Sequence, residues 1–285
     1  MKINKLFMFL LIGAAATLTT SCKKELLTQE KPMDNSLKTA SVSTEIIAHR
    51  GSNEFAPENT LASARLAWEE NADILECDVW LSADKRVMVS HDETTKRITG
   101  VDYSIPKTQS SVLRTLDVGK YKSDKYAGEK MPFLEELIAT VPPGKRLFIE
   151  LKSGDDMDAE ELVPYVRDII QKSGKESQMT IISFELDALK LSKQLIPNTP
   201  AVLVSYNYFL NIPYLFSVVS KYNLDGLDTY YLTTTRLFIN EAKKRNIPIY
   251  VWTVDKESDA KKLADKGVKG ITTNRPGYIR DILSN

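Results

Sequence analysis

Cysteine and histidine are scarce in this sequence. Two cysteines, Cys22 and Cys77, and two histidines, His49 and His91, are all that its 285 residues contain. They provide no disulfide framework, and no cluster of cysteine and histidine suggests a site for a soft metal. The fold must therefore depend on an ordinary hydrophobic core, for which 285 residues with 42% hydrophobic side chains are ample.

An excess of charge of one sign is also missing. Basic and acidic side chains number 38 each, and residues 1–21 contribute two lysines and no acid to that count. A chain without residues 1–21 would have 36 basic and 38 acidic side chains. Since the charges nearly balance and no basic cluster occurs, the sequence indicates no nucleic-acid partner.

The apolar run Leu6–Leu18 is too short to cross a bilayer, which takes about 20 residues. It follows lysines and precedes small residues, a pattern that predicts a signal peptide over residues 1–21. The following Ser21-Cys22 resembles a bacterial lipoprotein cleavage site, which implies export and a lipid on Cys22 that anchors the protein to a membrane. Ordinary secretion with an incidental cysteine is the alternative. Residues 22–44 are polar without apolar periodicity and predict a flexible tether.

From residue 45 to residue 285, short apolar runs alternate with amphipathic segments of helical length, which is typical of parallel βαβ units. The nine runs that predict strands are residues 46–50, 74–80, 87–91, 146–152, 179–184, 201–205, 226–231, 248–254 and 270–273. Residues 81–86 are too few for a parallel crossover, so residues 87–91 should form the return arm of a hairpin. The eight strands that remain predict a TIM barrel. An open, doubly wound sheet is the competing architecture, but polar residues at the strand ends favour a barrel, because all of its carboxyl ends converge on one mouth.

The segment between His91 and Arg146 interrupts this alternation. Residues 94–117 are polar with short apolar patches and predict an insertion near the carboxyl-terminal mouth of the barrel, before a helix start at Met131–Leu137. Long loops of this kind usually serve as lids or specificity elements, and a surface excursion without a role is the alternative.

Two predicted strands carry carboxylates where a core strand should be apolar. Side chains alternate between faces, so Glu76 and Asp78 share one face of their strand, and Glu150 and Lys152 repeat this arrangement. Carboxylates that lie together away from water repel each other and need a compensating cation. Three carboxylates suit one hard divalent cation, Ca²⁺ or Mg²⁺. An interior ion pair between Glu150 and Lys152 is the alternative.

Both histidines stand at ends of predicted strands, and each precedes a charged residue, as in His49-Arg50 and His91-Asp92. Histidine has an unperturbed pKa near neutrality, so the pair could accept and donate protons in one reaction. Strict alternation would put Arg50 on the face opposite His49. The strand must therefore end or turn at Gly51 if both residues serve one site.

These motifs together resemble the glycerophosphodiester phosphodiesterase family. The resemblance is carried, in this order, by His49-Arg50-Gly51, Pro57-Glu58-Asn59-Thr60, Glu76-x-Asp78-Val79, His91-Asp92 and Glu150-x-Lys152, and it covers nearly everything from Ile46 onward. It implies a TIM-barrel hydrolase that cleaves a small-molecule glycerophosphodiester to glycerol phosphate and an alcohol. It also implies Glu76, Asp78 and Glu150 as metal ligands and the histidines as an acid–base pair, without saying which takes which role.

The resemblance also implies a set of substrate-binding residues. Arg50 and Lys152 are expected to hold phosphate oxygens. Phe184 and Trp252 are expected to form an apolar wall for the glycerol or the leaving alcohol, with core packing as the alternative. Glu58 would either assist metal or substrate binding or bind backbone donors at a helix start.

Two other functions compete with this one. A phospholipase-like enzyme that cleaves intact lipids would need an apolar rim at the mouth, and residues 101–125 are too polar to provide one. A binding protein without catalysis would be indicated by loss of a histidine or carboxylate, and none is missing. Asn274 stands where the family often has aspartate, which puts a carboxylate role at that position in doubt but leaves the metal ligands unchanged.

Overall fold

A closed barrel of parallel strands forms the centre of the fold. The structure, a computed structural model, describes residues 44–206 and 212–284. The barrel closes because β1 (Glu45–Ala48) pairs both with β2 (Ile74–Leu81) and with β9 (Gly270–Thr273). Between them follow β4 (Arg146–Leu151), β5 (Met179–Ser183), β6 (Ala201–Ser205), β7 (Gly226–Tyr230) and β8 (Ile249–Trp252). The predicted TIM barrel is confirmed, and the open doubly wound sheet is excluded.

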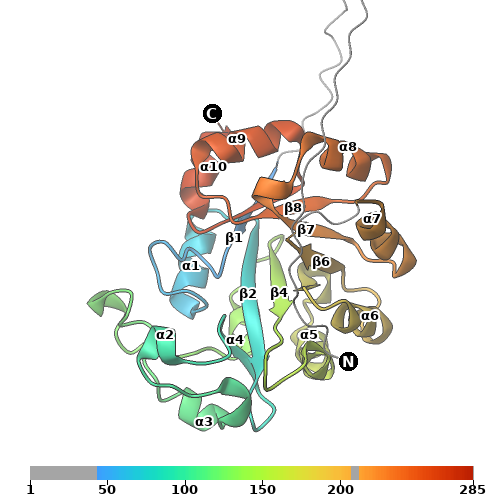
Figure 1. The fold of residues 1–285 in the computed structure, drawn as a ribbon. Coiled ribbons are helices and arrows are strands. Elements are labelled where there is room, and N and C mark those ends of the chain that lie inside the picture. Colours follow the sequence, from blue (N-terminus) through green and yellow to red (C-terminus); the bar gives the residue numbers. More distant parts are fainter. Residues whose placement is uncertain (1–43, 207–211, 285) are drawn as a thin grey trace, which may run out of the picture. The chain divides into compact units, whose positions relative to one another are not determined.

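Helices surround this barrel, as Figure 1 shows. They are α1 (Leu61–Glu69), α4 (Leu134–Ala139), α5 (Val163–Ser173), α6 (Leu186–Leu195), α7 (Ile212–Lys221), α8 (Arg236–Lys244), α9 (Glu257–Lys266) and α10 (Pro276–Ser284). Short 3₁₀ turns, η3 (Ala159–Leu162), η4 (Glu176–Gln178) and η5 (Tyr231–Thr233), lie in the connections. Among the described residues, no helix has the length and apolarity needed to cross a membrane.

The predicted hairpin is confirmed and lies outside the barrel. β3 (Val87–Val89) runs antiparallel to β2, with Val89 opposite Val79. The turn between these strands is closed by a hydrogen bond of 2.9 Å from Ser82 N to Arg86 O. Lys85 adopts a left-handed φ of 61° within it. A turn this short can only reverse the chain, which is why β3 adds no strand to the barrel.

The insertion between β3 and β4 contains short elements, which are α2 (Lys96–Thr99), η1 (Ile105–Lys107), α3 (Ser110–Leu113) and η2 (Asp124–Tyr126). Figure 1 shows α2 and α3 together at one side of the barrel. Tyr121 Oη accepts a hydrogen bond of 3.1 Å from Glu58 N, and Tyr126 Oη donates one of 3.0 Å to Phe55 O. The insertion therefore reaches the loop between β1 and α1, beside the barrel mouth, as the sequence predicts.

Alternating side chains divide the core into two layers. Inside the barrel lies a small cluster of Ile47, Ile74, Phe148, Ile182, Val202, Val204 and Tyr250. Outward-facing side chains pack beneath the helices in a larger cluster that includes Leu147, Ile149 and Cys77, which is buried and free. At the strand starts, called here the floor, Glu45 pairs with Arg146 at 2.5 Å and Lys269 at 3.0 Å. The opposite end, the mouth, carries the polar groups that the sequence places at strand ends.

Candidate active site

A left-handed turn directly after β1 brings His49 and Arg50 to the same cavity. β1 ends at Ala48 and not at residue 50, and the next residues include Arg50 with a φ of 54° and Gly51 with a φ of 85°. Alternation stops at this turn, so both side chains line the cavity in the mouth. A Cβ at Gly51 would lie 2.4 Å from Ser63 Oγ, which leaves room only for glycine.

Glu76, Asp78 and Glu150 meet at the carboxyl ends of β2 and β4. Asp78 is in register with Glu150, and one oxygen from each of the three carboxylates lies within 4.8 Å of the others. Glu76 Oε2 accepts a hydrogen bond of 2.9 Å from Arg50 N, but its buried Oε1 has no hydrogen-bond partner. An unpartnered carboxylate oxygen beside two other carboxylates fits a hard divalent cation, because such ions take oxygen ligands.

Two cations compensate part of this negative charge. Lys152 Nζ lies 2.9 Å from Glu150 Oε1 and 3.5 Å from Asp78 Oδ1. Arg50 Nε lies 3.4 Å from Asp78 Oδ2. The ion pair between Glu150 and Lys152 therefore exists together with the cluster of three carboxylates. It leaves Glu76 Oε1 without a partner.

The three carboxylates differ in acidity because their surroundings differ. Burial and the nearby Asp78 carboxylate raise the pKa of Glu76 well above its ordinary value. Burial also raises the pKa of Glu150 to about 7, against the lowering effect of Lys152. Burial opposes ionisation of Asp78 as well, but Lys152 and Arg50 hold its pKa below the ordinary value. A divalent cation would replace the protons that Glu76 and Glu150 otherwise retain.

The hydrogen bonds of His49 define its tautomer. Asn274 Nδ2 donates to Asp255 Oδ2 at 2.6 Å, which turns Asn274 Oδ1 towards His49 Nδ1 at 2.7 Å. Since that oxygen can only accept, Nδ1 carries the proton and Nε2 is an acceptor. Burial, together with the Arg50 charge, lowers the pKa of His49 to about 4, so the ring is neutral at neutral pH.

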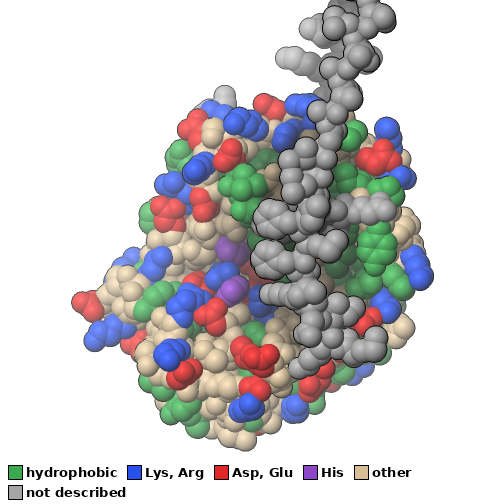
Figure 2. Space-filling model, in the orientation of Figure 1, with side chains coloured by type: hydrophobic (Ala, Val, Ile, Leu, Met, Phe, Trp, Pro, Cys, Tyr) green, Lys and Arg blue, Asp and Glu red, His purple; other side chains and the backbone are tan. Residues whose placement is uncertain are grey.

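His91 has a charged partner instead. Its Nδ1 lies 2.7 Å from Asp92 Oδ1, and a carboxylate there favours the protonated ring. Burial nevertheless lowers the pKa of His91 below its ordinary value. Asp92 is held in turn by Arg97 Nε at 2.6 Å. Figure 2 shows the histidine side chains close together on one face of the barrel, beside basic and acidic side chains.

Glu58 binds arginines and not backbone donors. Its Oε1 accepts from Arg50 at 2.9 Å, and Arg97 donates to both of its oxygens at 2.7 and 2.8 Å. The start of α1 is capped by Thr60, whose hydroxyl accepts from Ser63 N at 3.2 Å. The helix-start alternative for Glu58 is therefore wrong, and Glu58 connects Arg50 with the insertion.

Aromatic side chains form one wall of the cavity, whose volume is about 360 Å³. The Phe184 and Trp252 rings lie 5.8 Å apart, and Tyr206 lies 5.4 Å from Phe184 and 5.1 Å from Trp252. Phe184 is 37% exposed, so core packing does not account for its position. The aromatic side chains thus line the same cavity as the charged residues, where the apolar wall is expected.

The residues that line this cavity without being expected from the sequence include Tyr206, Asp228 and Thr272. Asp228 and Thr272 are buried on inward-facing positions of β7 and β9. A signal did exist for Asp228, which interrupts an apolar strand as Glu76 does. Nothing in the sequence distinguishes Tyr206 or Thr272 from residues that only pack.

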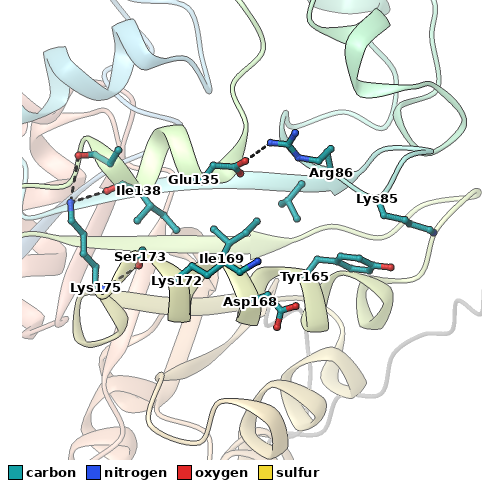
Figure 3. A pocket seen from close by; sticks show the side chains of 12 residues that line it. Lys85, Arg86, Glu135, Ile138, Tyr165, Asp168, Ile169, Lys172, Ser173 and Lys175 are labelled. Atoms are coloured by element: carbon teal, nitrogen blue, oxygen red, sulfur yellow. Dashed lines mark hydrogen bonds and ion pairs between the residues drawn. The ribbon is translucent and has the colours of Figure 1, made fainter.

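A second cavity, of about 640 Å³, lies on the outer surface between α4, α5 and the hairpin turn (Figure 3). Lys85, Arg86, Lys172 and Lys175 contribute to its lining, and Arg86 pairs with Glu135. Lys175 Nζ donates to Val141 O at 2.7 Å. Its lining contains no histidine and none of the metal-site carboxylates, so the chemistry lies at the mouth and not in this larger groove.

A TIM barrel with this mouth belongs to the class of barrel hydrolases that act on phosphate esters. The chain belongs to the glycerophosphoryl diester phosphodiesterase family, which matches residues 49–278. Its reaction class is therefore the hydrolysis of phosphoric diesters.

Individual relatives agree with this membership. A glycerophosphodiester phosphodiesterase from Caldanaerobacter subterraneus is 30% identical over 84% of this chain and 98% of its own length. A human lysophospholipase D is 27% identical over 84% of this chain and 86% of its own. The crystal structure of an Oleispira antarctica phosphodiesterase with its product sn-glycerol-3-phosphate matches with a TM-score of 0.79 and 27% identity, over 86% of this chain and 98% of that one.

Proposed function

We propose that this protein hydrolyses glycerophosphodiesters to glycerol phosphate and an alcohol, with one divalent cation, Ca²⁺ or Mg²⁺, held by Glu76, Asp78 and Glu150. The observation that supports this proposal best is that metal-type carboxylates, phosphate-binding cations and both histidines surround one cavity. The cation would supply charge neutralisation at a phosphoryl oxygen. Because the full polar set is present, a barrel that only binds is not favoured.

Arg50 and Lys152 bind the non-bridging oxygens of the diester. Both line the cavity, and both are fixed by carboxylates, Arg50 by Glu58 at 2.9 Å and Lys152 by Glu150 at 2.9 Å. A diester carries one negative charge, and more charge develops on its oxygens as water attacks phosphorus. Cations that are already oriented stabilise that charge without reorganisation.

His49 acts as the general base and His91 as the general acid. His49 Nε2, unprotonated and in a neutral ring, accepts a proton from the attacking water as its oxygen bonds to phosphorus. The bond from phosphorus to the alcohol oxygen breaks, and His91 donates the proton that this oxygen needs; Asp92 at 2.7 Å stabilises the protonated His91 ring against the burial that lowers its pKa. His49 gains a proton from the water and His91 gives one to the alcohol, so the total charge of the two rings is unchanged.

Metal dependence is tested by choline release from glycerophosphocholine. Activity is expected to disappear in excess chelator and to return with Ca²⁺ or Mg²⁺, which also shows the preferred ion. Glu76→Gln and Glu150→Gln should abolish activity and weaken cation binding measured by calorimetry. Full activity of the wild-type protein in chelator would refute the metal-dependent mechanism.

The histidine roles are tested with two leaving groups. His49→Asn and His91→Asn should each lower the rate on glycerophosphocholine roughly 10²–10⁴-fold while leaving cation affinity unchanged. A nitrophenyl diester needs no proton on its leaving group, so it should restore much of the rate to His91→Asn only. Rescue of His49→Asn instead would reverse the assignment, and near-wild-type rates for both variants would remove the acid–base pair.

A lysophospholipid is the second candidate substrate, because an apolar rim does exist at the mouth. Exposed apolar side chains also occur within residues 101–125, such as Val101 and Tyr121, but those of the proposed rim follow β5, β6 and β7. They are Phe184, Tyr206, Tyr214, Leu232 and Leu237, which are 37 to 72% exposed. The relative named lysophospholipase D supports the same candidate. Replacing Leu232 and Leu237 with serine should impair hydrolysis of lysophosphatidylcholine and spare glycerophosphocholine, and equal effects on both would exclude the rim from substrate binding.

We also propose that the protein is exported and anchored to a membrane through lipid on Cys22, on the periplasmic or cell-surface side. This proposal is supported by the charged and apolar pattern of residues 1–21 alone, which lie outside the described residues. The predicted tether, residues 22–44, lies outside them as well, apart from residue 44.

A further inference from the structure

Asp228 is a buried carboxyl group in the cavity that the mechanism above does not use. It lies at an inward-facing position of β7, in register with Val204 on β6 and Tyr250 on β8. The residue is 3% exposed, and its Oδ1 has no hydrogen-bond partner. Thr272 Oγ1, on β9, is also buried and without a partner. Both residues line the cavity near its apolar interior.

Such a group destabilises the folded protein. A buried polar atom without a hydrogen bond has lost its bonds to water and gained none from the protein. Burial raises the pKa of Asp228 well above its ordinary value, and the Glu150 charge adds to this effect. Burial thus favours the protonated form of the side chain, which can both donate and accept a hydrogen bond. A side chain that destabilises the folded protein and borders a cavity is explained if it binds a ligand there.

The surroundings define the chemistry of that ligand. Ile182, Val204 and the Trp252 ring provide apolar contacts in the same cavity. The charged groups that would hold phosphate, Arg50 and Lys152, follow β1 and β4, each of which is three strands away from β7 around the barrel. A ligand that extends from these cations towards Asp228 must carry hydroxyls on a short carbon chain.

We propose that Asp228, with Thr272, binds the glycerol hydroxyls of the substrate, so that the glycerol half lies inside the barrel and the alcohol half lies at the open rim. This inference rests on the proposed function and adds an orientation to it. The buried end of the cavity recognises the part that all glycerophosphodiesters share. The exposed aromatic end, with Tyr206 at 48% exposure, contacts the part that varies.

The test compares glycerophosphocholine with propylphosphocholine, which has the same leaving group and no hydroxyls. Asp228→Leu, of similar shape and without polar atoms, should lower kcat/KM on glycerophosphocholine about 10–100-fold and change it less than about 3-fold on propylphosphocholine. Thr272→Val should act in the same direction with a smaller effect. Asp228→Asn, which keeps a donor and an acceptor, should retain most of the preference for glycerol.

Stability and binding measurements complete the test. Asp228→Leu should melt at a higher temperature than the wild-type protein, because it removes an unpartnered buried group, so a loss of rate would not reflect unfolding. Affinity for sn-glycerol-3-phosphate should fall with Asp228→Leu while affinity for propyl phosphate stays the same. Equal losses on both diesters, or no loss on either, would overturn the role of Asp228. If the wild-type protein cleaves neither diester, the proposed function fails, and the comparison of the two phosphates still decides whether Asp228 binds glycerol.

Discussion

Residues of one type acquire different properties in this barrel because their neighbours differ. Glu150 and Asp78 are in register on adjacent strands, yet burial raises the pKa of Glu150 to about 7 while Lys152 and Arg50 keep Asp78 ionised despite its burial. The acidic group therefore contains both a permanent carboxylate and carboxylates that hold protons until a cation displaces them.

This difference predicts how pH affects the metal-free protein. Glu150 has a pKa of about 7 when folded and 4.5 as its ordinary value, so the folded state binds more protons within this window. Stability therefore falls as pH rises through it. His49 has the opposite effect below pH 6.5. Because its pKa in the folded state is about 4, stability rises with pH in that range. We expect the chelator-treated protein to melt at a lower temperature at pH 8 than at pH 6.5, and Glu150→Gln to reduce that difference.

A divalent cation should reverse this dependence, because it binds the deprotonated carboxylates. Its stabilisation should be larger at pH 8 than at pH 6.5. If the melting temperatures of the wild-type protein and of Glu150→Gln changed equally with pH, Glu150 would not titrate between pH 6.5 and pH 8.

Exchanging the side chains of Asn274 and Asp255 should change the pH profile of the reaction. The exchange of Asn274→Asp with Asp255→Asn preserves the hydrogen bond of 2.6 Å between these side chains and moves the charge next to His49. A carboxylate at Nδ1 would raise the pKa of His49, so the acidic limb of kcat/KM should shift to higher pH. Asp255→Asn alone is the control for loss of charge. An unchanged acidic limb in the double variant would mean that His49 is not the base.

At the scale of elements, the connection between β1 and α1 determines the geometry of the mouth. It contains the left-handed Arg50 and Gly51, whose backbone lies against Ser63 in the first turn of α1. The same turn brings Arg50 N to 2.9 Å from Glu76 Oε2. Packing of the helix on the strand thus fixes a contact in the active site.

Gly51→Ala tests this connection against Gly100→Ala. Both glycines have a positive φ, of 85° and 77°, but a Cβ at Gly100 meets nothing within 4 Å. Gly100→Ala should cost about 1 kcal/mol of folding free energy in denaturant titrations, through backbone strain alone. Gly51→Ala should cost about 1–3 kcal/mol more because of overpacking, and it should also lower activity. Equal costs would show that Ser63 moves aside freely.

The elements could be predicted from the sequence because their signals are local. Apolar runs of the right length locate the strands within two residues, and the short segment 81–86 alone identifies the hairpin. The sequence required an end or a turn of β1 at Gly51 but not the left-handed φ of Arg50, because contacts with Glu76 and Ser63, which come later in the chain, stabilise that conformation. Arg97 was overlooked for the same reason, since its partners Glu58 and Asp92 lie in other segments.

The residues of the candidate site were likewise only partly predictable from the sequence. Paired carboxylates and strand-end histidines stand out because charge is unusual in core strands. Glu76, Glu150 and both histidines line one cavity together with Arg50 and Lys152, and Asp78 lies beside the two glutamates. Asp228 had the same type of signal without a neighbouring motif to support it. The apolar rim consists of single side chains from separate connections and helices, each of which is unremarkable by itself.

At the scale of the whole molecule, a lipid on Cys22 would attach the protein to a membrane. Cys22→Ala should stop processing at that residue or release a soluble form, and kcat/KM on glycerophosphocholine should not change, because the cavity residues all come from 49 onward. Membrane fractionation and the mass of the mature amino terminus measure both effects. A wild-type protein that is wholly soluble and carries no lipid would exclude the anchor.

The direction of β1 has a consequence for the source of the substrate. β1 begins at Glu45 on the floor, where Glu45 pairs with Arg146, and it ends at the mouth with His49. An attachment through the residues before Glu45 would therefore join the barrel at the end opposite its histidines. An enzyme attached in this way would act as a stationary scavenger, whose mouth takes up diesters that reach it by diffusion.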